Sequence, residues 1–305
     1  MLQSIRSFTR LAWFTLAYHV LVILWGAFVR ATGSGAGCGY HWPQCNGQLI
    51  PHTTVMSTWI EFGHRITSFV ALVLVVWLTW SAFRVSSKGA PLRYGAVASL
   101  IFLIMEALIG AVLVLLELVA QNTSLKRGLS TFLHLINTFL LVASLALTAW
   151  LSSGNPPPRI QQNRTLAICI ATGLLSALGV AATGSIAALG DTLFPSQMLT
   201  EGISADFLPT AHLFLRLRIY HPLWALLASG YLLALVLITH RKLSYPPLVP
   251  LGHSLIGCTI LQAMLGFFNM ALLAPIPLQL IHLLIANIMW ILLVLWATRA
   301  LAFPQ

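Results

Sequence analysis

The chain has 305 residues, of which 58% are apolar and only 7% carry a charge. Soluble domains carry roughly 25% charged residues, so this composition excludes a water-soluble protein. The formal net charge is +10, but the basic residues punctuate loops instead of forming a stripe, which excludes a nucleic-acid groove binder, and four cysteines exclude a disulfide-dense scaffold.

Eight apolar runs are each long enough to cross a bilayer, which requires roughly 20 residues in a helix. We place them at residues 11–30, 62–83, 94–116, 131–151, 165–188, 221–239, 248–272 and 278–301. The runs are continuous and do not alternate, so they predict helices and not the strands of a membrane barrel. The first run is longer than the usual core of a signal peptide and is expected to be retained.

The loops between these runs divide into a strongly basic side and a side that holds every acid except Glu106. The basic side carries Arg6, Arg10, Arg84, Lys88, Arg93, Arg159, Arg164, Arg241, Lys242 and Arg299. The positive-inside rule makes this side cytoplasmic. We therefore expect a multi-pass protein of the inner (plasma) membrane with both termini in the cytoplasm.

Four histidines lie near the non-cytoplasmic ends of alternate runs: His64, His134, His221 and His282. Ionisable side chains at membrane depth are costly and usually serve a function. Two imidazoles on facing helices of a bundle can clamp a flat macrocycle from both sides. The pattern predicts two haem sites, and the alternative for each histidine is a hydrogen bond to a neighbouring helix.

The order of these landmarks indicates a duplicated four-helix unit. The tetrapeptide ATGS at 31–34 recurs at 182–185, and the segment at 106–110 resembles that at 262–266. The histidines recur in the same order, which pairs His64 with His134 and His221 with His282. A four-helix unit returns to its starting side, so the repeats are expected to be parallel.

The predicted fold is therefore an all-α polytopic membrane protein, with eight transmembrane helices arranged as two parallel-repeat four-helix bundles. The N-terminal bundle is expected at 1–151, with the catalytic or substrate haem site. A linker follows at 152–163, and the C-terminal bundle, with a resident haem site, is expected at 164–305.

The two halves differ beside the first histidine of each pair. Glu61 precedes His64 by one helical turn, whereas Arg218 precedes His221 at the matching place. A carboxylate beside a bound group can act as a general base or stabilise positive charge. An arginine at a haem edge suits a propionate. This asymmetry predicts chemistry in the first half and electron transfer in the second.

Each of these polar residues also has a structural alternative. Glu61 could cap its helix, with Ser57 and Thr58 as other cap candidates. Arg65 is either a second propionate partner or an interface anchor. A protonated Glu106 that hydrogen-bonds another helix would account for a charged residue type inside the third run.

The first outer loop, residues 32–50, is rich in glycine, so its backbone can approach a ligand closely. Cys38 and Cys45 lie in this loop on the oxidising side of the predicted topology. A disulfide between them is chemically allowed, and a pair of free or redox-cycling thiols is the alternative. His41 lies between them and is expected to be solvated.

These motifs together resemble the haem A synthase family. The specific part is GSGAGC at 33–38, WPQCNG at 42–47 and EFGHR at 61–65, which the three later histidines complete. The resemblance covers nearly the whole chain. It implies a membrane oxidoreductase that converts the C8 methyl group of haem O to a formyl group, which makes haem A for cytochrome oxidase.

The resemblance also implies residue roles. Glu61 would be the catalytic carboxylate, and Cys38 and Cys45 would form the loop pair that many bacterial members have. His64 and His134 would line the haem O site, and His221 and His282 would be the axial ligands of haem b. The second half departs from the family pattern, because RLRIYHP at 216–222 replaces a Gly-His-Arg motif, so His212 is a competing ligand.

Two other function classes remain open at this stage. One is a dihaem membrane b-type cytochrome that only transfers electrons, and the other is a non-enzymatic haem-transfer or oxidase-assembly protein. The expected cofactor is haem b with its iron, and the expected substrate is haem O. Haem O synthase, oxidase assembly factors and membrane lipids are candidate partners, nucleic acid is not, and homo-oligomerisation stays open.

Overall fold

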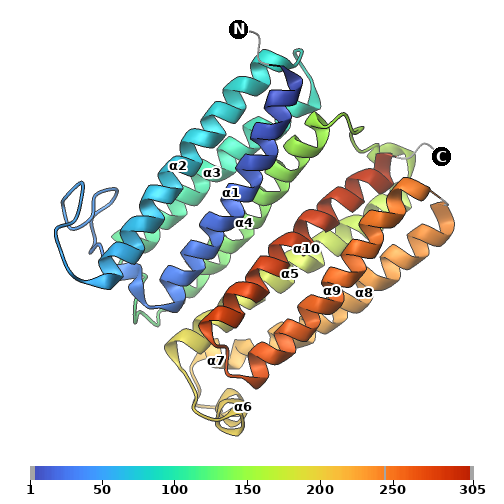
Figure 1. The fold of residues 1–305 in the computed structure, drawn as a ribbon. Helices are drawn as coiled ribbons and strands as arrows, with labels where there is room; N and C mark the ends of the chain where they lie inside the picture. The colour runs from blue at the N-terminus through green and yellow to red at the C-terminus, as the bar shows by residue number, and fades with distance from the viewer. Residues whose placement is uncertain (1–3, 244, 303–305) are drawn as a thin grey trace.

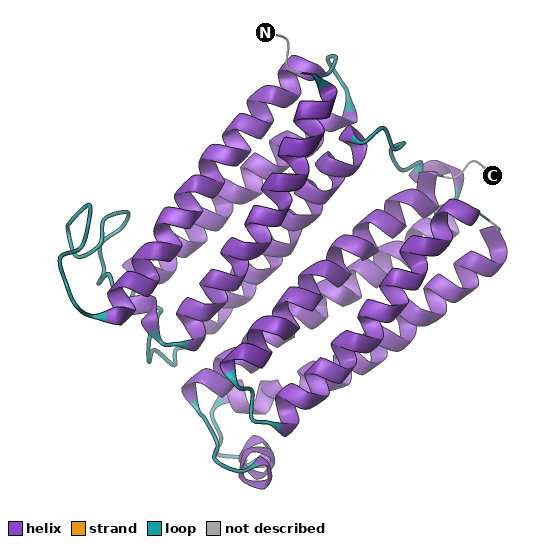
Figure 2. Cartoon of the chain, in the orientation of Figure 1, coloured by secondary structure: helices purple, strands orange, loops and turns teal. Residues whose placement is uncertain are grey.

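A computed structural model describes residues 4–243 and 245–302 of the chain. Helices dominate this part, and Figure 2 shows them joined by loops without a strand among the described residues. Eight helical segments of the described chain are long and apolar enough to cross a membrane. The prediction of an all-α polytopic membrane protein is therefore confirmed.

The long helices are α1 (Ile5–Ala31), α2 (Met56–Val85), α3 (Pro91–Leu115), α4 (Leu125–Ser152), α5 (Arg164–Leu193), α8 (Tyr220–Leu243), α9 (Val249–Ala271) and α10 (Ile276–Ala302). Two short helices, α6 (Leu199–Phe207) and α7 (Leu213–Arg218), precede α8, and 3₁₀ turns lie at Ser34–Ala36, Ile160–Gln162 and Pro246–Leu248. Most helices begin earlier than the apolar runs suggest, because their first turns contain polar residues. Helix α1, for example, is capped by Ser4, whose Oγ accepts from the backbone N–H of Ser7 at 3.3 Å.

The helices pack in two groups of four long helices. Helices α1 to α4 contact one another in sequence and α4 returns to α1, while α5, α8, α9 and α10 contact one another in the same cyclic manner. Figure 1 shows the two groups side by side, with α1, α4, α5 and α10 along their boundary. Descent of the two groups from one duplicated unit stays a prediction.

Polar contacts tie the two groups together. The indole N–H of Trp290 in α10 donates to the carbonyl of Phe139 in α4 at 2.7 Å, deep in the core. Arg30, at the end of α1, donates across the boundary to Ala188 O at 2.6 Å, Thr192 Oγ1 at 2.7 Å and Gln279 Oε1 at 2.9 Å. One guanidinium therefore joins α1 to both α5 and α10.

We expect Arg30→Ala to lower the thermal stability of the protein. Each hydrogen bond from a charged donor contributes about 1.5–3 kcal/mol, so the unfolding midpoint in detergent should fall by several degrees. Arg30→Lys keeps the charge but lacks the planar group that reaches acceptors on two helices. Its unfolding midpoint should therefore lie between those of the unmodified protein and Arg30→Ala. An unchanged midpoint for Arg30→Ala would show that the boundary does not depend on this contact.

The loops place the sequence landmarks at one end of the molecule. Both chain ends lie at one end of the helices, and the 32–55 loop, α6 and α7 lie at the other (Figure 1). The four histidines belong to α2, α4, α8 and α10, near the ends where these helices leave the second set of loops. All four therefore lie toward the same end of the bundles, and their shared depth in a membrane stays a prediction.

Candidate functional site

The first pair of histidines lies between α2 and α4. His64 and His134 are both half-buried. The His64 ring packs against Gly26 of α1, where an added Cβ would lie 3.0 Å from His64 Cε1 and 3.2 Å from Nε2. A larger residue at Gly26 would push the ring away from its partner.

Helix α3 supplies a polar neighbour to His134. The Oε1 atom of Glu106 lies 3.7 Å from His134 Nε2. Glu106 also accepts from the side-chain amide of Asn137 at 2.6 Å, and it accepts a short hydrogen bond from Thr138 Oγ1. All three partners belong to α4, so the expectation that Glu106 hydrogen-bonds another helix is confirmed. Its proximity to His134 was not anticipated from the sequence.

The second pair of histidines is built in the same way. His221 of α8 packs against Gly184 of α5, where an added Cβ would lie 2.9 Å from His221 Cε1. His282 of α10 has a polar neighbour on α9, because Gln262 Nε2 lies 3.1 Å from His282 Nε2.

The imidazole nitrogens themselves fit axial ligation of a haem. His221 Nδ1 lies 3.2 Å from the carbonyl of Val180, an arrangement that leaves Nε2 as the ligating atom and is typical of metal-bound histidines. The Nδ1 atoms of His64, His134 and His282 are buried without a hydrogen-bond partner among the described residues. Of the four rings, His221 therefore has the hydrogen-bonded orientation that is typical of a histidine that holds a metal through Nε2.

The number of imidazoles in each bundle can be compared with what different metal sites need. The described residues contain no group of three or more His, Cys, Asp or Glu side chains placed to hold an ion. Structural zinc sites need four such ligands and catalytic ones usually three. Two imidazoles per bundle are sufficient for a macrocycle that already supplies four equatorial nitrogens.

The first outer loop is fixed onto the start of α2. Cys38 and Cys45 form a disulfide. Thr58 Oγ1 donates to the carbonyl of Gly37 at 2.7 Å. A Cβ at Gly37 would lie 2.4 Å from the carbonyl oxygen of Ser57, so only glycine allows the two backbones to come this close.

Glu61 is the centre of this attachment. It is buried, with 4% of its surface exposed. Its Oε2 accepts from the backbone N–H of Cys38 at 2.8 Å, and its Oε1 accepts from Arg65 Nη2 at 2.5 Å. Arg65 Nη1 in turn donates to the carbonyls of His41 and Gln44, both at 2.6 Å. Glu61 and Arg65 together hold the disulfide loop over the end of α2 that carries His64.

The capping hypothesis for Glu61 is wrong. Helix α2 begins at Met56 with Val55 as its N-cap residue, and no side chain caps it. Glu61 lies in the second turn, and neither Ser57 nor Thr58 is the cap. The start of this helix was predicted from the apolar run alone, which does not include the polar first turns, so the predicted start is too late.

The two arginines proposed as propionate partners have protein partners in the structure. Arg65 is engaged as described above. Arg218 donates to Asp191 Oδ1 at 2.6 Å and to Asp206 Oδ1 at 2.6 Å, which ties the end of α5 and helix α6 to the end of α7. Sequence analysis missed both aspartates, although they lie on the same predicted side as Arg218. In the second half, the ion pairs of Arg218 fasten the segment between α5 and α8, whereas a disulfide closes the corresponding loop in the first half.

His212 has a structural role that separates it from His221. Its Nδ1 accepts from the backbone N–H of Phe214 at 3.2 Å and caps α7. Its ring packs against those of Phe194 and Phe214, with centroids at 4.9 and 4.7 Å. The exposed side chain of His41 matches the expectation of a solvated loop histidine.

Pro222 accounts for the irregular start of α8. Helix α7 ends at Arg218 and α8 begins at Tyr220, so one residue interrupts the helix before His221. Proline has no N–H and cannot bond the carbonyl of the residue four positions earlier. The missing bond would have joined Pro222 to Arg218, and the interruption lies between these two residues.

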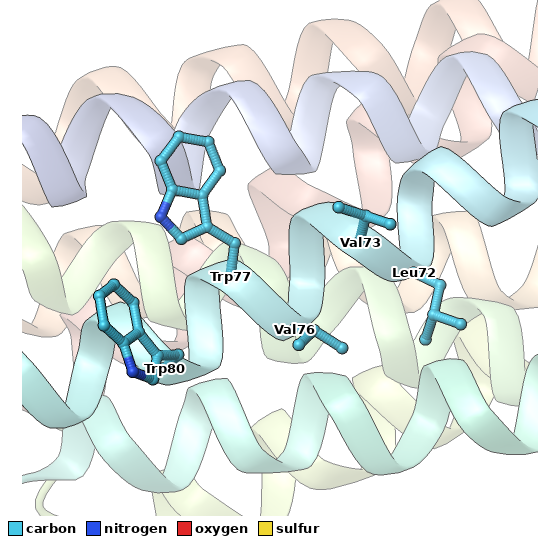
Figure 3. A pocket seen from close by; sticks show the side chains of 5 residues that line it. All are labelled: Leu72, Val73, Val76, Trp77 and Trp80. Carbon is cyan, nitrogen blue, oxygen red and sulfur yellow. The ribbon is translucent and has the colours of Figure 1, made fainter.

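A shallow apolar hollow of about 580 Å³ lies away from all four histidines. It is formed by Leu72, Val73, Val76, Trp77 and Trp80, all of which belong to α2 (Figure 3). These residues follow His64 toward the end of α2 at Val85, and both tryptophans are about half exposed. An open, apolar helix face of this kind suits contact with lipid.

The chain matches one protein family over most of its length, and it is similar to several curated proteins. Residues 9–294 match the COX15-CtaA family, described as cytochrome oxidase assembly protein. A heme A synthase of Staphylococcus carnosus is 30% identical over 209 residues, which are 66% of this chain and 68% of that protein. A heme A synthase of Bacillus cereus is 41% identical over 92 residues, which are 30% of each chain.

A further relative differs in name and length. A protein of Thermus thermophilus named protoheme IX farnesyltransferase is 43% identical over 291 residues, which are 95% of this chain but 48% of that protein. The chain thus spans about half the length of the Thermus relative. Because the family match covers nearly all the residues that carry the fold and the four histidines, the chain belongs to the COX15-CtaA family of cytochrome oxidase assembly proteins, the family of haem A synthase.

Proposed function

We propose that this protein is a haem A synthase, which oxidises the C8 methyl group of haem O to a formyl group. The observation that carries the proposal is the difference between two similarly built histidine pairs. Only the pair His64 and His134 lies beneath a disulfide loop that is attached through a buried carboxylate, Glu61. One bundle is therefore equipped for chemistry, and the other for holding a group.

In this proposal the second bundle binds haem b. His221 and His282 are the residues that would hold it, and a bound haem b would supply one-electron transfer chemistry. The contact of His221 Nδ1 with Val180 O supports the assignment, because it orients the ring with Nε2 available. Gly184 leaves the space that the ring occupies.

The first bundle receives haem O between His64 and His134. Glu61 acts there as a general base or stabilises the positive charge that develops at the reacting carbon. The N–H of Cys38 and the guanidinium of Arg65 fix both carboxylate oxygens, so the group is oriented before substrate arrives. Preorganisation of this kind avoids a reorganisation cost during the reaction.

Two alternatives are tested by the same measurement. A transmembrane electron carrier usually needs haems near both faces, whereas the four histidines here share one end of the bundles. A farnesyltransferase activity is suggested only by the name of the Thermus relative, half of which has no counterpart in this chain. Its product would be a prenylated haem, and not a formyl-bearing one.

The test is pigment analysis of the full chain purified from cells that supply haem O. Haem A synthase predicts haem b together with haem O and haem A, separated by chromatography and identified by mass. Haem b alone would favour the electron carrier. New haem O made from protohaem, without haem A, would favour the farnesyltransferase.

The proposed location is the plasma membrane with both termini in the cytoplasm. Reporter fusions at residue 205, in α6, and at the C-terminus are expected to report opposite sides. The basic loops all lie at the end of the bundles opposite to α6, which is the physical reason for this orientation. A C-terminal fusion that reports the outside would contradict the proposed topology.

The disulfide is expected to contribute to activity without contacting the reaction. Cys38→Ser breaks the disulfide that closes the loop, so it should lower activity and stability. Haem b in the second bundle should remain. Haem b content, melting temperature and haem A formation measure these effects. Normal activity in the serine variant would show that Glu61 and Arg65 hold the loop by themselves.

A further inference from the structure

Arg127 is a buried arginine without an acidic partner, at the end of the first bundle that carries the histidines. It belongs to α4, and only 5% of its surface is exposed. Its Nη1 donates to the carbonyls of Ala120 and Asn122, at 2.5 and 2.8 Å. Its Nε and Nη2 donate to no atom of the described residues, and no ion pair among those residues includes it. A buried charge is costly unless an opposite charge offsets it.

The other basic side chains at this end of the bundles have partners or are exposed. Three of them bind carboxylates or acceptors on other helices, namely Arg65, Arg218 and Arg30. Two are exposed, namely Lys126 and Arg216. Within the described chain, Arg127 therefore combines burial with two donor nitrogens that no protein group uses.

Arg127 lies on the same face of α4 as His134. The two residues are two helical turns apart, which is about 10 Å along the axis. Both approach α3 or the loop that follows it, because His134 lies beside Glu106 of α3 and Arg127 donates to the loop carbonyls. The unused donors therefore lie on the loop side of the first histidine pair, at about the distance that separates a haem iron from its propionate carboxylates.

We propose that Arg127 binds a propionate of the haem that lies between His64 and His134. A guanidinium and a carboxylate form a charge-assisted pair, and two neighbouring N–H groups of the guanidinium match the two carboxylate oxygens. Nε and Nη2 form such a neighbouring pair of donors. This inference rests on the proposed function, because it concerns the haem O site.

The same contact orients the substrate. On haem O, the C8 methyl group lies next to a propionate on one pyrrole ring. Glu61 precedes His64 by one turn and therefore also lies on the loop side of the histidine pair. A propionate held by Arg127 thus turns the reacting edge of the macrocycle toward the side where Glu61 lies. The second bundle has Pro275 two turns before His282, so it lacks this arginine.

The test compares the binding of haem b with that of its dimethyl ester, in which both propionates are neutral. The full-length protein carries His221→Ala, so that the first histidine pair is the intact one. Dissociation constants for both probes are measured by absorbance titration in detergent. Arg127→Gln and Arg127→Lys are made in this background. Lys126→Gln is the matched control, because it removes a neighbouring positive charge that is exposed.

We expect the His221→Ala parent to bind haem b about 10–100-fold more tightly than the ester, which is the usual effect of a hydrogen bond to a charged group. Arg127→Gln should abolish this preference, and Lys126→Gln should keep it in full. Arg127→Lys should keep part of it, because an ammonium has the charge but not the paired donors. A parent without the preference, or an Arg127→Gln variant that retains it, would overturn the inference.

A purely structural role for Arg127 predicts a different result. If the side chain only fastens the loop at Ala120 and Asn122, Arg127→Gln should lower the melting temperature and weaken both probes by the same factor, which also contradicts the inference. Arg127→Lys can still donate to the loop carbonyls, so it decides the case if Arg127→Gln does not fold. An unchanged preference in Arg127→Lys would then count against the paired contact.

The outcomes also separate this inference from the proposed function. If the His221→Ala protein binds neither probe and the unmodified protein makes no haem A, both are wrong. If the unmodified protein makes haem A, but Arg127→Gln prefers haem b over the ester as strongly as its parent does, only the inference on Arg127 is wrong.

Discussion

His221→Ala and His282→Ala are each expected to remove the haem b spectrum from the purified protein. Each variant removes one of the two imidazoles that would hold the haem, and neither Gly184 nor the carboxamide of Gln262 supplies an imidazole in its place. Loss of a ligand or its supporting contacts typically weakens metal binding by at least about 10–100-fold. Reduced-minus-oxidised absorbance spectra and haem quantification per polypeptide measure the result.

The first pair is expected to behave differently. His64→Ala and His134→Ala should leave most haem b in the second bundle and lower the yield of haem A. Core contacts such as that of Trp290 with Phe139 O hold the two bundles together independently of these rings. If all four variants lose the same haem b equally, the separate roles of the two bundles are wrong.

His212→Ala is the matched control for this series. His212 lies near His221 in sequence but caps α7 through Phe214 N. Loss of a helix cap costs about 1 kcal/mol, so this variant should melt slightly earlier and keep its haem b spectrum. If His212→Ala loses the haem b spectrum and His221→Ala keeps it, then His212, and not His221, is the haem b ligand.

The membrane helices, and the placement of the four histidines toward one end of them, could be predicted because the bilayer imposes a strong constraint. Each crossing needs a long apolar run, and the polar residues of each run mark its ends. Helix starts were less predictable. Helix α2 begins at Met56 and not near 62, because its first turns include Glu61 and contact the loop.

The partners of the polar side chains could not be predicted in the same way. The sequence shows that Arg65 and Arg218 are basic and lie near histidines, which suggested propionate binding. The structure pairs Arg65 with Glu61 and Arg218 with Asp191 and Asp206. Such pairs depend on how α6, α7 and the glycine-rich loop fold back, and no periodicity in the sequence encodes that.

The contact of Glu106 with His134 illustrates an intermediate case. The repeat analysis aligned Glu106 with Gln262 and His134 with His282, so all four residues were singled out. What it lacked was the packing of α3 on α4 and of α9 on α10, which brings each polar side chain to its histidine. Once that packing is known, Glu106 beside His134 and Gln262 beside His282 are seen to be equivalent contacts in the two bundles.

Glu61→Gln is expected to insert normally, retain haem b through His221 and His282, and accumulate haem O or a partly oxidised intermediate. General acid–base assistance is typically worth about 10²–10⁴-fold in rate, so haem A formation should fall by a factor in that range. The amide keeps an oxygen that can accept from the N–H of Cys38, and it loses the charge that pairs with Arg65.

A purely structural role for Glu61 predicts a different pattern, which Arg65→Gln helps to identify. If Glu61 serves only to attach the disulfide loop, Arg65→Gln should lower melting temperature and activity at least as much as Glu61→Gln, because it breaks the same ion pair and also removes the hydrogen bonds to His41 and Gln44. If the carboxylate takes part in the reaction, Glu61→Gln should lose far more haem A formation than Arg65→Gln, although its melting temperature falls no further. Turnover at the unmodified rate in Glu61→Gln would remove this carboxylate from the mechanism.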